Sequence, residues 1–137
     1  MTIALVLLLA GKMAAFNDLL GAKWTCTLGK FTYYAEYNVA GSTLHGHLYS
    51  KGSSEDTYYG YDAQHKRYWI DSADSTGATE SQTSTDGLTF VGTLFDGTTT
   101  SKATNIYTLS SPHKWIVRAK GSAGGSPYDV TATCVRS

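Results

Sequence analysis

The sequence lacks an excess of charge of either sign. Its 137 residues include 11 Lys or Arg and 11 Asp or Glu, so that 16% are charged, whereas about 25% is typical of soluble domains. Nucleic-acid binding relies on clustered basic side chains that neutralise phosphates and release counterions. The sparse and balanced charge therefore argues against a nucleic-acid partner, and the zero formal net charge favours neither strongly acidic nor strongly basic partners.

The sequence also lacks an apolar run long enough to cross a membrane. Residues 3–10 are all apolar, but a membrane-spanning helix needs roughly 20 such residues, and we predict no stable span. The run resembles the apolar core of a secretory signal peptide, with Ala14 and Ala15 near a cleavage point, although no Lys or Arg precedes it. On this interpretation the mature protein is secreted or periplasmic.

A second interpretation of residues 1–15 is an apolar helix that packs against neighbouring subunits, since a large exposed apolar surface is usually buried in an interface. The chain would then be a structural or assembly protein that self-associates through this segment. Under either interpretation, residues 1–15 are separate from a single domain that spans residues 16–137.

No catalytic signature is present in the sequence. A Gly-x-Ser-x-Gly nucleophile elbow is absent. The carboxylate pairs Glu55 with Asp56 and Asp71 with Asp74 fall near predicted turns, without a base or nucleophile beside them. We identify no catalytic residue and favour a non-enzymatic role, with a barrel enzyme acting on a small hydrophobic substrate as the alternative.

Histidine is scarce, with four in the chain. His45 and His47 share one face of a predicted strand because side chains alternate along a strand. A metal site needs at least a third ligand, and the other two histidines, His65 and His113, fall in predicted turns or at strand ends. We therefore predict a polar exposed face there, no metal site, no haem and no other cofactor.

The residues that are abundant indicate a β-protein. Ten Tyr and 14 Gly accompany only two Pro, and aromatic residues favour strands while Gly supplies turns. The clearest alternation runs over residues 31–39, where Tyr33 and Tyr37 share a face. The pattern predicts ten strands, over residues 24–28, 31–39, 43–50, 56–61, 67–72, 78–83, 88–95, 98–109, 113–120 and 127–135.

The connections between these strands are mostly two to five residues long, and no helical segment follows residue 20. Successive short hairpins predict an antiparallel up-and-down β-barrel, which we expect to have about 8–10 strands. Residues 16–20 are expected to form a short N-terminal helical turn that plugs one end. In such a barrel the first and last strands are neighbours, so Cys26 and Cys134 are expected to form a disulfide, with two buried free thiols as the alternative.

Three groups of residues resemble a known superfamily. Residues 19–21 followed by Trp24 resemble the Gly-x-Trp entry of the calycins, which include lipocalins, fatty-acid-binding proteins and nitrobindin-like barrels. Residues 60–62, 66–69 and 90–93 are similar to a bacterial, often exported, lipocalin-like family of unknown function. The resemblance implies a barrel with a possible ligand cavity and no particular reaction. It also implies that Arg136 packs over Trp24 as a structural seam.

The sequence departs from the family pattern at two places. One extra residue separates Gly21 from Trp24, and Tyr68 is inserted before Trp69. Each departure predicts a β-bulge or a shifted register, because one added residue reverses the face that a side chain takes.

Aromatic residues are the candidate ligand-binding residues. Those that alternation places on inner faces are Tyr33, Tyr37, Tyr59, Tyr61 and Trp115. An aromatic interior with hydroxyl groups at its edges suits a small hydrophobic ligand. The alternative is a core filled by the barrel's own side chains. We predict an exported barrel that binds a small hydrophobic molecule.

Overall fold

The computed structural model describes residues 19–137. The expectations for residues 1–15, whether signal peptide or assembly helix, lie outside this range, as does most of the helical turn predicted over residues 16–20. Residues 19–21 form a turn, and the part of the chain that the structure describes contains strands and turns but no helix. It therefore includes no helix that could span a membrane.

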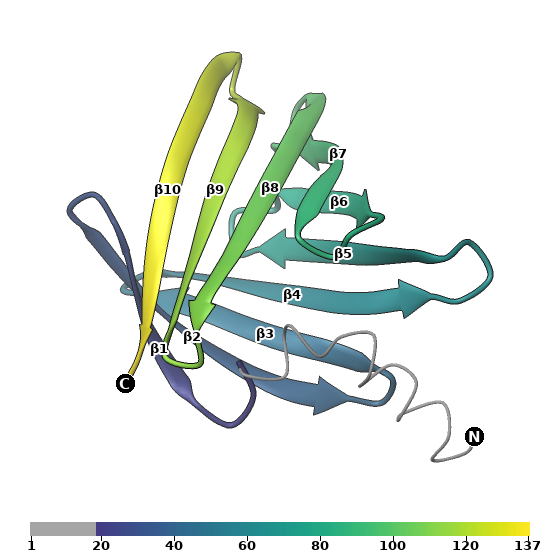
Figure 1. The fold of residues 1–137 in the computed structure, drawn as a ribbon. Helices are drawn as coiled ribbons and strands as arrows, with labels where there is room; N and C mark the ends of the chain where they lie inside the picture. Colours follow the sequence, from purple (N-terminus) through teal and green to yellow (C-terminus); the bar gives the residue numbers. More distant parts are fainter. Residues whose placement is uncertain (1–18) are drawn as a thin grey trace.

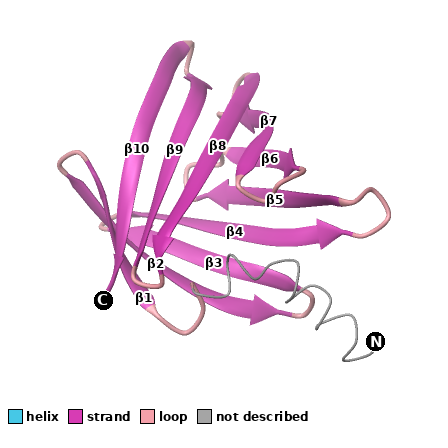
Figure 2. Ribbon diagram, in the orientation of Figure 1, coloured by secondary structure: helices cyan, strands magenta, loops and turns pink. Residues whose placement is uncertain are grey.

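Ten strands form one closed sheet (Figure 1). Every strand pairs antiparallel with the next in the chain, and β10 closes on β1, so the fold is the predicted up-and-down barrel (Figure 2). The strands are β1 (Lys23–Leu28), β2 (Phe31–Ala40), β3 (Thr43–Ser50), β4 (Ser53–Asp62), β5 (Arg67–Asp74), β6 (Thr79–Ser84), β7 (Thr89–Phe95), β8 (Thr100–Ser111), β9 (Lys114–Ala123) and β10 (Ser126–Arg136).

Aspartates build several of the turns. Asp86 accepts hydrogen bonds from the backbone N–H groups of Leu88 and Thr89, both at 2.8 Å. Gly87 adopts a φ of 78° in this turn, a conformation that glycine reaches without a steric penalty. Asp62, Asp74 and Asp96 bond in the same way to backbone N–H groups just beyond them. These short local turns fix the order of the strands around the barrel.

The seam between β1 and β10 is closed covalently. Cys26 lies directly opposite Cys134, and the two form the predicted disulfide across 108 residues of sequence. Trp24 lies opposite Arg136 two pairs further along, and the guanidinium carbon is 5.9 Å from the centre of the Trp24 ring. The disulfide and the cation–π contact therefore lie along the same seam, as expected.

The bulges predicted near Trp24 and Tyr68 are not present. The pairing of β1 with β2 and with β10, and that of β4 with β5, is continuous through these residues. The one register shift in the barrel lies between Leu109 and Ser111, where β8 pairs with β9. The extra residue before Trp24 lies in or next to the turn that precedes β1. Tyr68 is an ordinary position of the β4–β5 ladder, paired with Tyr61, and the next residue, Trp69, packs over Gly60.

The interior divides into two layers along the barrel axis. The end that contains the start of β1 is filled by a cluster of buried rings: Trp24, Tyr37, Tyr59, Phe90, Tyr107 and Trp115. Leu19 covers this end, and its carbonyl oxygen accepts a hydrogen bond from the Trp24 indole at 3.1 Å. Gly46 makes room for the Tyr37 ring, since a Cβ there would lie 2.7 Å from that ring. The aromatic layer is thus the solid core of the molecule.

Candidate functional site

A cavity of about 300 Å³ lies at the opposite end of the barrel. It is bordered by the ends of β1 and β3, by the start of β4, and by the turn between β5 and β6, while β9 and β10 form its far side. The volume falls at the lower end of the range for small-molecule sites, roughly 300–1,000 Å³. The barrel therefore has one packed end and one hollow end.

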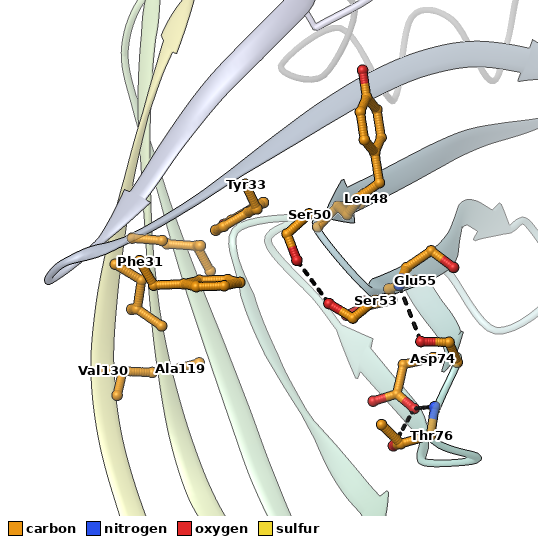
Figure 3. A pocket seen from close by; sticks show the side chains of 16 residues that line it. Phe31, Tyr33, Leu48, Ser50, Ser53, Glu55, Asp74, Thr76, Ala119 and Val130 are labelled. Atoms are coloured by element: carbon orange, nitrogen blue, oxygen red, sulfur yellow. Dashed lines mark hydrogen bonds between the residues drawn. The ribbon is translucent and has the colours of Figure 1, made fainter.

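The two walls of the cavity differ in polarity (Figure 3). One wall, which we call the apolar wall, comes from β1, β2, β9 and β10 and includes Leu28, Phe31, Tyr33, Val117, Ala119 and Val130. The facing wall, the acidic wall, comes from β3, β4, β5 and the turn after β5, and includes Ser50, Ser53, Glu55, Asp74 and Thr76. A ligand in this space would contact hydrocarbon on one side and hydroxyl and carboxyl groups on the other.

Glu55 is the central carboxyl group of the acidic wall. Its pKa is raised to about 7, chiefly by burial and then by the nearby carboxyl groups of Glu80 and Asp74, while a hydrogen bond with Ser72 opposes the shift. None of the residues that line the cavity is Lys or Arg. The carboxyl group is consequently close to half-ionised at neutral pH, and the cavity supplies no cation to neutralise it.

Two other carboxyl groups lie near Glu55, and each already has partners. Asp74 accepts hydrogen bonds from the backbone N–H groups of Thr76 and Ala78, and these bonds hold its pKa below the ordinary value even though burial opposes them. Glu80 accepts a hydrogen bond from the Asn105 amide at 2.7 Å, and burial raises its pKa. Asp74 therefore belongs to a turn, and Glu80 belongs to a pair with Asn105.

Tyr33 is the predicted ligand-binding residue that lines the cavity. Its ring stacks on that of Phe31, with centroids 6.2 Å apart. Burial raises the pKa of the Tyr33 phenol, with further contributions from Tyr59 and Glu55. The hydroxyl group thus stays protonated and can donate a hydrogen bond toward a ligand or toward the acidic wall.

The other predicted ligand-binding residues lie away from the cavity surface. Tyr37, Tyr59 and Trp115 belong to the aromatic cluster, where the Tyr37 and Trp115 centroids are 6.3 Å apart. Tyr59 shares a hydrogen bond with Tyr107 between their hydroxyl groups at 3.1 Å. Trp115 is two residues along β9 from Val117, so these rings form the next layer inward from the cavity.

Tyr61 lies near the end of β4 that is remote from the cavity, where its ring packs edge-on against Tyr68, with the ring centroids 5.0 Å apart.

Glu55 lines the cavity but is not among the predicted ligand-binding residues. The sequence pattern predicts a strand that begins at residue 56 and leaves Glu55 in the preceding turn. The strand begins at Ser53, and Glu55 has the same alternation as Tyr59 and Tyr61. That shared parity is the sequence signal that could have placed it inside the barrel.

His45 and His47 face outward, as expected. Both rings hydrogen-bond to the same carboxylate oxygen of Asp56, at 2.8 and 3.0 Å, and these bonds lower the pKa of Asp56. Each imidazole also stacks on a tyrosine, Tyr58 or Tyr49. Within residues 19–137 no group of three His, Cys, Asp or Glu side chains is arranged to hold a metal ion.

Comparison with known proteins assigns no family to the chain. No protein-family model matches it, and no curated protein matches it significantly. The functional proposal therefore rests on the closed barrel, the cavity and the chemistry of its two walls.

Proposed function

We propose that this protein is an exported, calycin-like barrel that binds a small hydrophobic or amphipathic molecule in the cavity at its hollow end. The observation that carries the proposal is a cavity of about 300 Å³ with one wall of apolar side chains, in an otherwise packed barrel. Ligand pockets combine mostly apolar surfaces with a few polar groups that orient the ligand. The apolar wall and the acidic wall supply these two components.

The predicted aromatic residues take different positions in this proposal. Tyr33 contacts the ligand from the apolar wall, and Tyr37, Tyr59 and Trp115 close the inner end of the site. Tyr61 keeps its proposed role only for a ligand long enough to pass the aromatic layer. For a small ligand, Tyr33 is the aromatic residue whose removal should weaken binding most.

Export is supported by the disulfide. The bond between Cys26 and Cys134 suits an oxidising compartment, where disulfides persist. A secreted or periplasmic location is therefore part of the proposal, and cleavage near Ala14 or Ala15 would complete it. N-terminal sequencing of the protein from its natural source tests cleavage. An intact N-terminus, together with oligomers that disappear when residues 1–15 are deleted, would support the assembly role instead.

Binding is tested with a neutral apolar fluorophore, N-phenyl-1-naphthylamine, titrated into the protein. We expect saturable binding to one site. Ala119→Phe should weaken binding at least about tenfold, because the added ring fills the cavity beside Val117 and Val130. Ala73→Phe, which adds the same ring to the outer face of β5, is the matched control and should bind normally.

Circular dichroism of both variants establishes that the barrel is intact. Failure of the wild-type protein to bind the fluorophore would contradict the proposal. Equal binding by the Ala119→Phe variant would show that the fluorophore does not occupy this cavity, which would also count against it.

The pKa of Glu55 favours a second candidate, an enzyme acting on a small hydrophobic substrate. A carboxyl group with a pKa of about 7 inside a cavity is suited to general acid–base chemistry. This candidate requires that a bound molecule be chemically changed, with a rate that follows one ionisation near neutral pH and is lost in Glu55→Gln. A ligand extracted from the barrel unchanged after long incubation, as shown by mass spectrometry, would exclude it for that ligand.

A further inference from the structure

We propose that the cavity selects a cationic amphiphile, a molecule with a small apolar body and a protonated amine that the Glu55 carboxylate binds. The inference rests on the proposed ligand-binding function and adds the chemical class of the ligand. It follows from three features: the cavity, the apolar wall, and a carboxyl group on the opposite, acidic wall with no Lys or Arg among the lining residues (Figure 3).

Glu55 is the carboxyl group with capacity left for a ligand. Asp74, directly opposite it on β5, already accepts bonds from the N–H groups of Thr76 and Ala78. Glu80 already accepts a bond from Asn105. Glu55 interacts with Ser72, which leaves acceptor sites on its two oxygens, because an ionised carboxylate offers about four.

A second polar group inside the barrel has unused hydrogen-bonding capacity. Gln82 lies two residues deeper than Glu80 on the inner face of β6 and is 1% exposed. Neither atom of its amide group has a hydrogen-bond partner within residues 19–137. Buried polar groups nearly always have a partner in folded proteins. Gln82 does not line the cavity, however, so the choice of ligand class rests on Glu55.

The electrostatics favour a cation over the other ligand classes. The ionisable groups around Glu55 are Asp74 on the neighbouring β5, Glu80 on β6, Asp56 beside it, and the phenols of Tyr33, Tyr37 and Tyr59. All of them are acidic. A carboxylate ligand would therefore meet like charges, whereas an ammonium group would form a charge-assisted hydrogen bond in a partly desolvated site.

The size and shape of the site limit the rest of the ligand. A volume of about 300 Å³ suits a molecule of one or two rings. Such a body would lie against Tyr33, Val117 and Ala119, while its amine reaches the acidic wall. The expected class is an arylalkyl amine or a similarly compact amine.

The test uses three probes that share one ring system: 1-naphthylmethylamine, 1-naphthalenemethanol and 1-naphthoate. Isothermal titration calorimetry near pH 8, where Glu55 is ionised, measures the binding of each to the full chain. We expect the amine to bind at least about tenfold more tightly than the alcohol, which is the gain of a hydrogen bond to a charged group. The naphthoate should bind most weakly.

The substitution Glu55→Gln tests whether the Glu55 carboxylate causes the preference for the amine. The variant should remove most of the preference for the amine, measured as the ratio of the amine and alcohol affinities, since Gln keeps the size of the side chain and removes its charge. Asp71→Asn removes the same charge from the outer face of β5 and is the matched control, which should keep the preference. In the wild type, the preference should also shrink near pH 5.5, where Glu55 is protonated.

The outcomes separate this inference from the proposed function. If the alcohol binds as tightly as the amine, or if Glu55→Gln keeps the full preference, the cavity binds ligands but does not select cations, and the inference is overturned alone. If none of the three probes binds, the proposed function fails and this inference fails with it. A preference that depends on Glu55 in both the variant and the pH series supports it.

Discussion

The two ends of this barrel are built from the same alternating strands, but one end is filled by side chains and the other encloses a cavity. At the packed end, Trp24, Tyr37 and Trp115 fill the interior with large rings. At the hollow end, the inward positions of the same strands carry smaller or ionisable side chains, such as Ala119, Val117 and Glu55. The difference teaches that size and charge at inward positions, and not strand pairing, decide where a barrel is solid and where it is open.

The comparison also separates stability from function. The packed end contains the disulfide, the Trp24–Arg136 contact and the aromatic core, all of which hold the fold. The hollow end contains an unneutralised carboxyl group, which costs stability and is retained in a cavity. Changes at the packed end should therefore unfold the protein, and changes at the hollow end should mainly alter binding.

The largest expected effect is on the free energy of unfolding at the packed end. Trp24 is 1% exposed, and Trp24→Ala removes its contacts with Trp115 and its hydrogen bond to Leu19. We expect a loss of about 3–5 kcal/mol, as for other buried aromatic residues. Urea denaturation measures it. Phe31→Ala at the hollow end, where the side chain is 50% exposed, is the control and should cost far less. Equal losses would remove the distinction between the two ends.

The disulfide gives the next effect. The double variant Cys26→Ala, Cys134→Ala removes a cross-link between residues 108 apart in sequence. We expect its free energy of unfolding to be lower by about 2–5 kcal/mol. Non-reducing mass spectrometry of the wild type should show no free thiol, and denaturation of the variant measures the loss. Unchanged stability in the variant would mean that strand pairing alone closes the seam.

A smaller change in the free energy of unfolding, this time a gain in stability, is expected when Glu55 is replaced by Gln. Its pKa in the folded protein, about 7, exceeds the ordinary 4.5, so folding favours the protonated form. The stability that this form contributes is complete below about pH 4.5 and is lost as pH rises through 7. Glu55→Gln, which stays neutral, should therefore be more stable than the wild type by about 1–3 kcal/mol near pH 8 and equal to it near pH 4.

Denaturation midpoints across this pH range measure the effect, with Asp71→Asn as the control for loss of a carboxylate from the outer face. A difference between Glu55→Gln and the wild type that does not vary with pH would show that desolvation of Glu55 is not the cause.

The smallest change in the free energy of unfolding is expected for Asp86, in the turn between β6 and β7. Hydrogen bonds from Thr89, Leu88 and Ser84 lower the pKa of Asp86 below its ordinary value of 3.8. The stabilisation is therefore present above about pH 4 and lost as pH falls through the lowered pKa, the reverse of Glu55. Asp86→Ala should cost about 1 kcal/mol or less at neutral pH, since the site is exposed. Thermal denaturation near pH 7 and at decreasing acid pH should show the difference shrinking as pH falls.

Much of the fold was predictable because it depends on local pattern. Alternation placed Tyr33 and Tyr37 on the inner face of one strand, and glycine-containing turns such as that at Gly87 separated the ten strands. In a closed barrel of consecutive antiparallel strands, the first and last strands are neighbours. The pairing of Cys26 with Cys134 is then expected, because these two Cys of the chain lie on those strands.

The sequence by itself thus determined the strands, their order, the seam and the direction in which most side chains point. Only the tertiary structure decided which inward side chains meet across the barrel, because that depends on the tilt and stagger of strands far apart in sequence. Trp115 falls in the packed layer and Val117 in the cavity, although they are two residues apart. The raised pKa of Glu55 likewise comes from burial and from Glu80 on another strand, which no local pattern encodes.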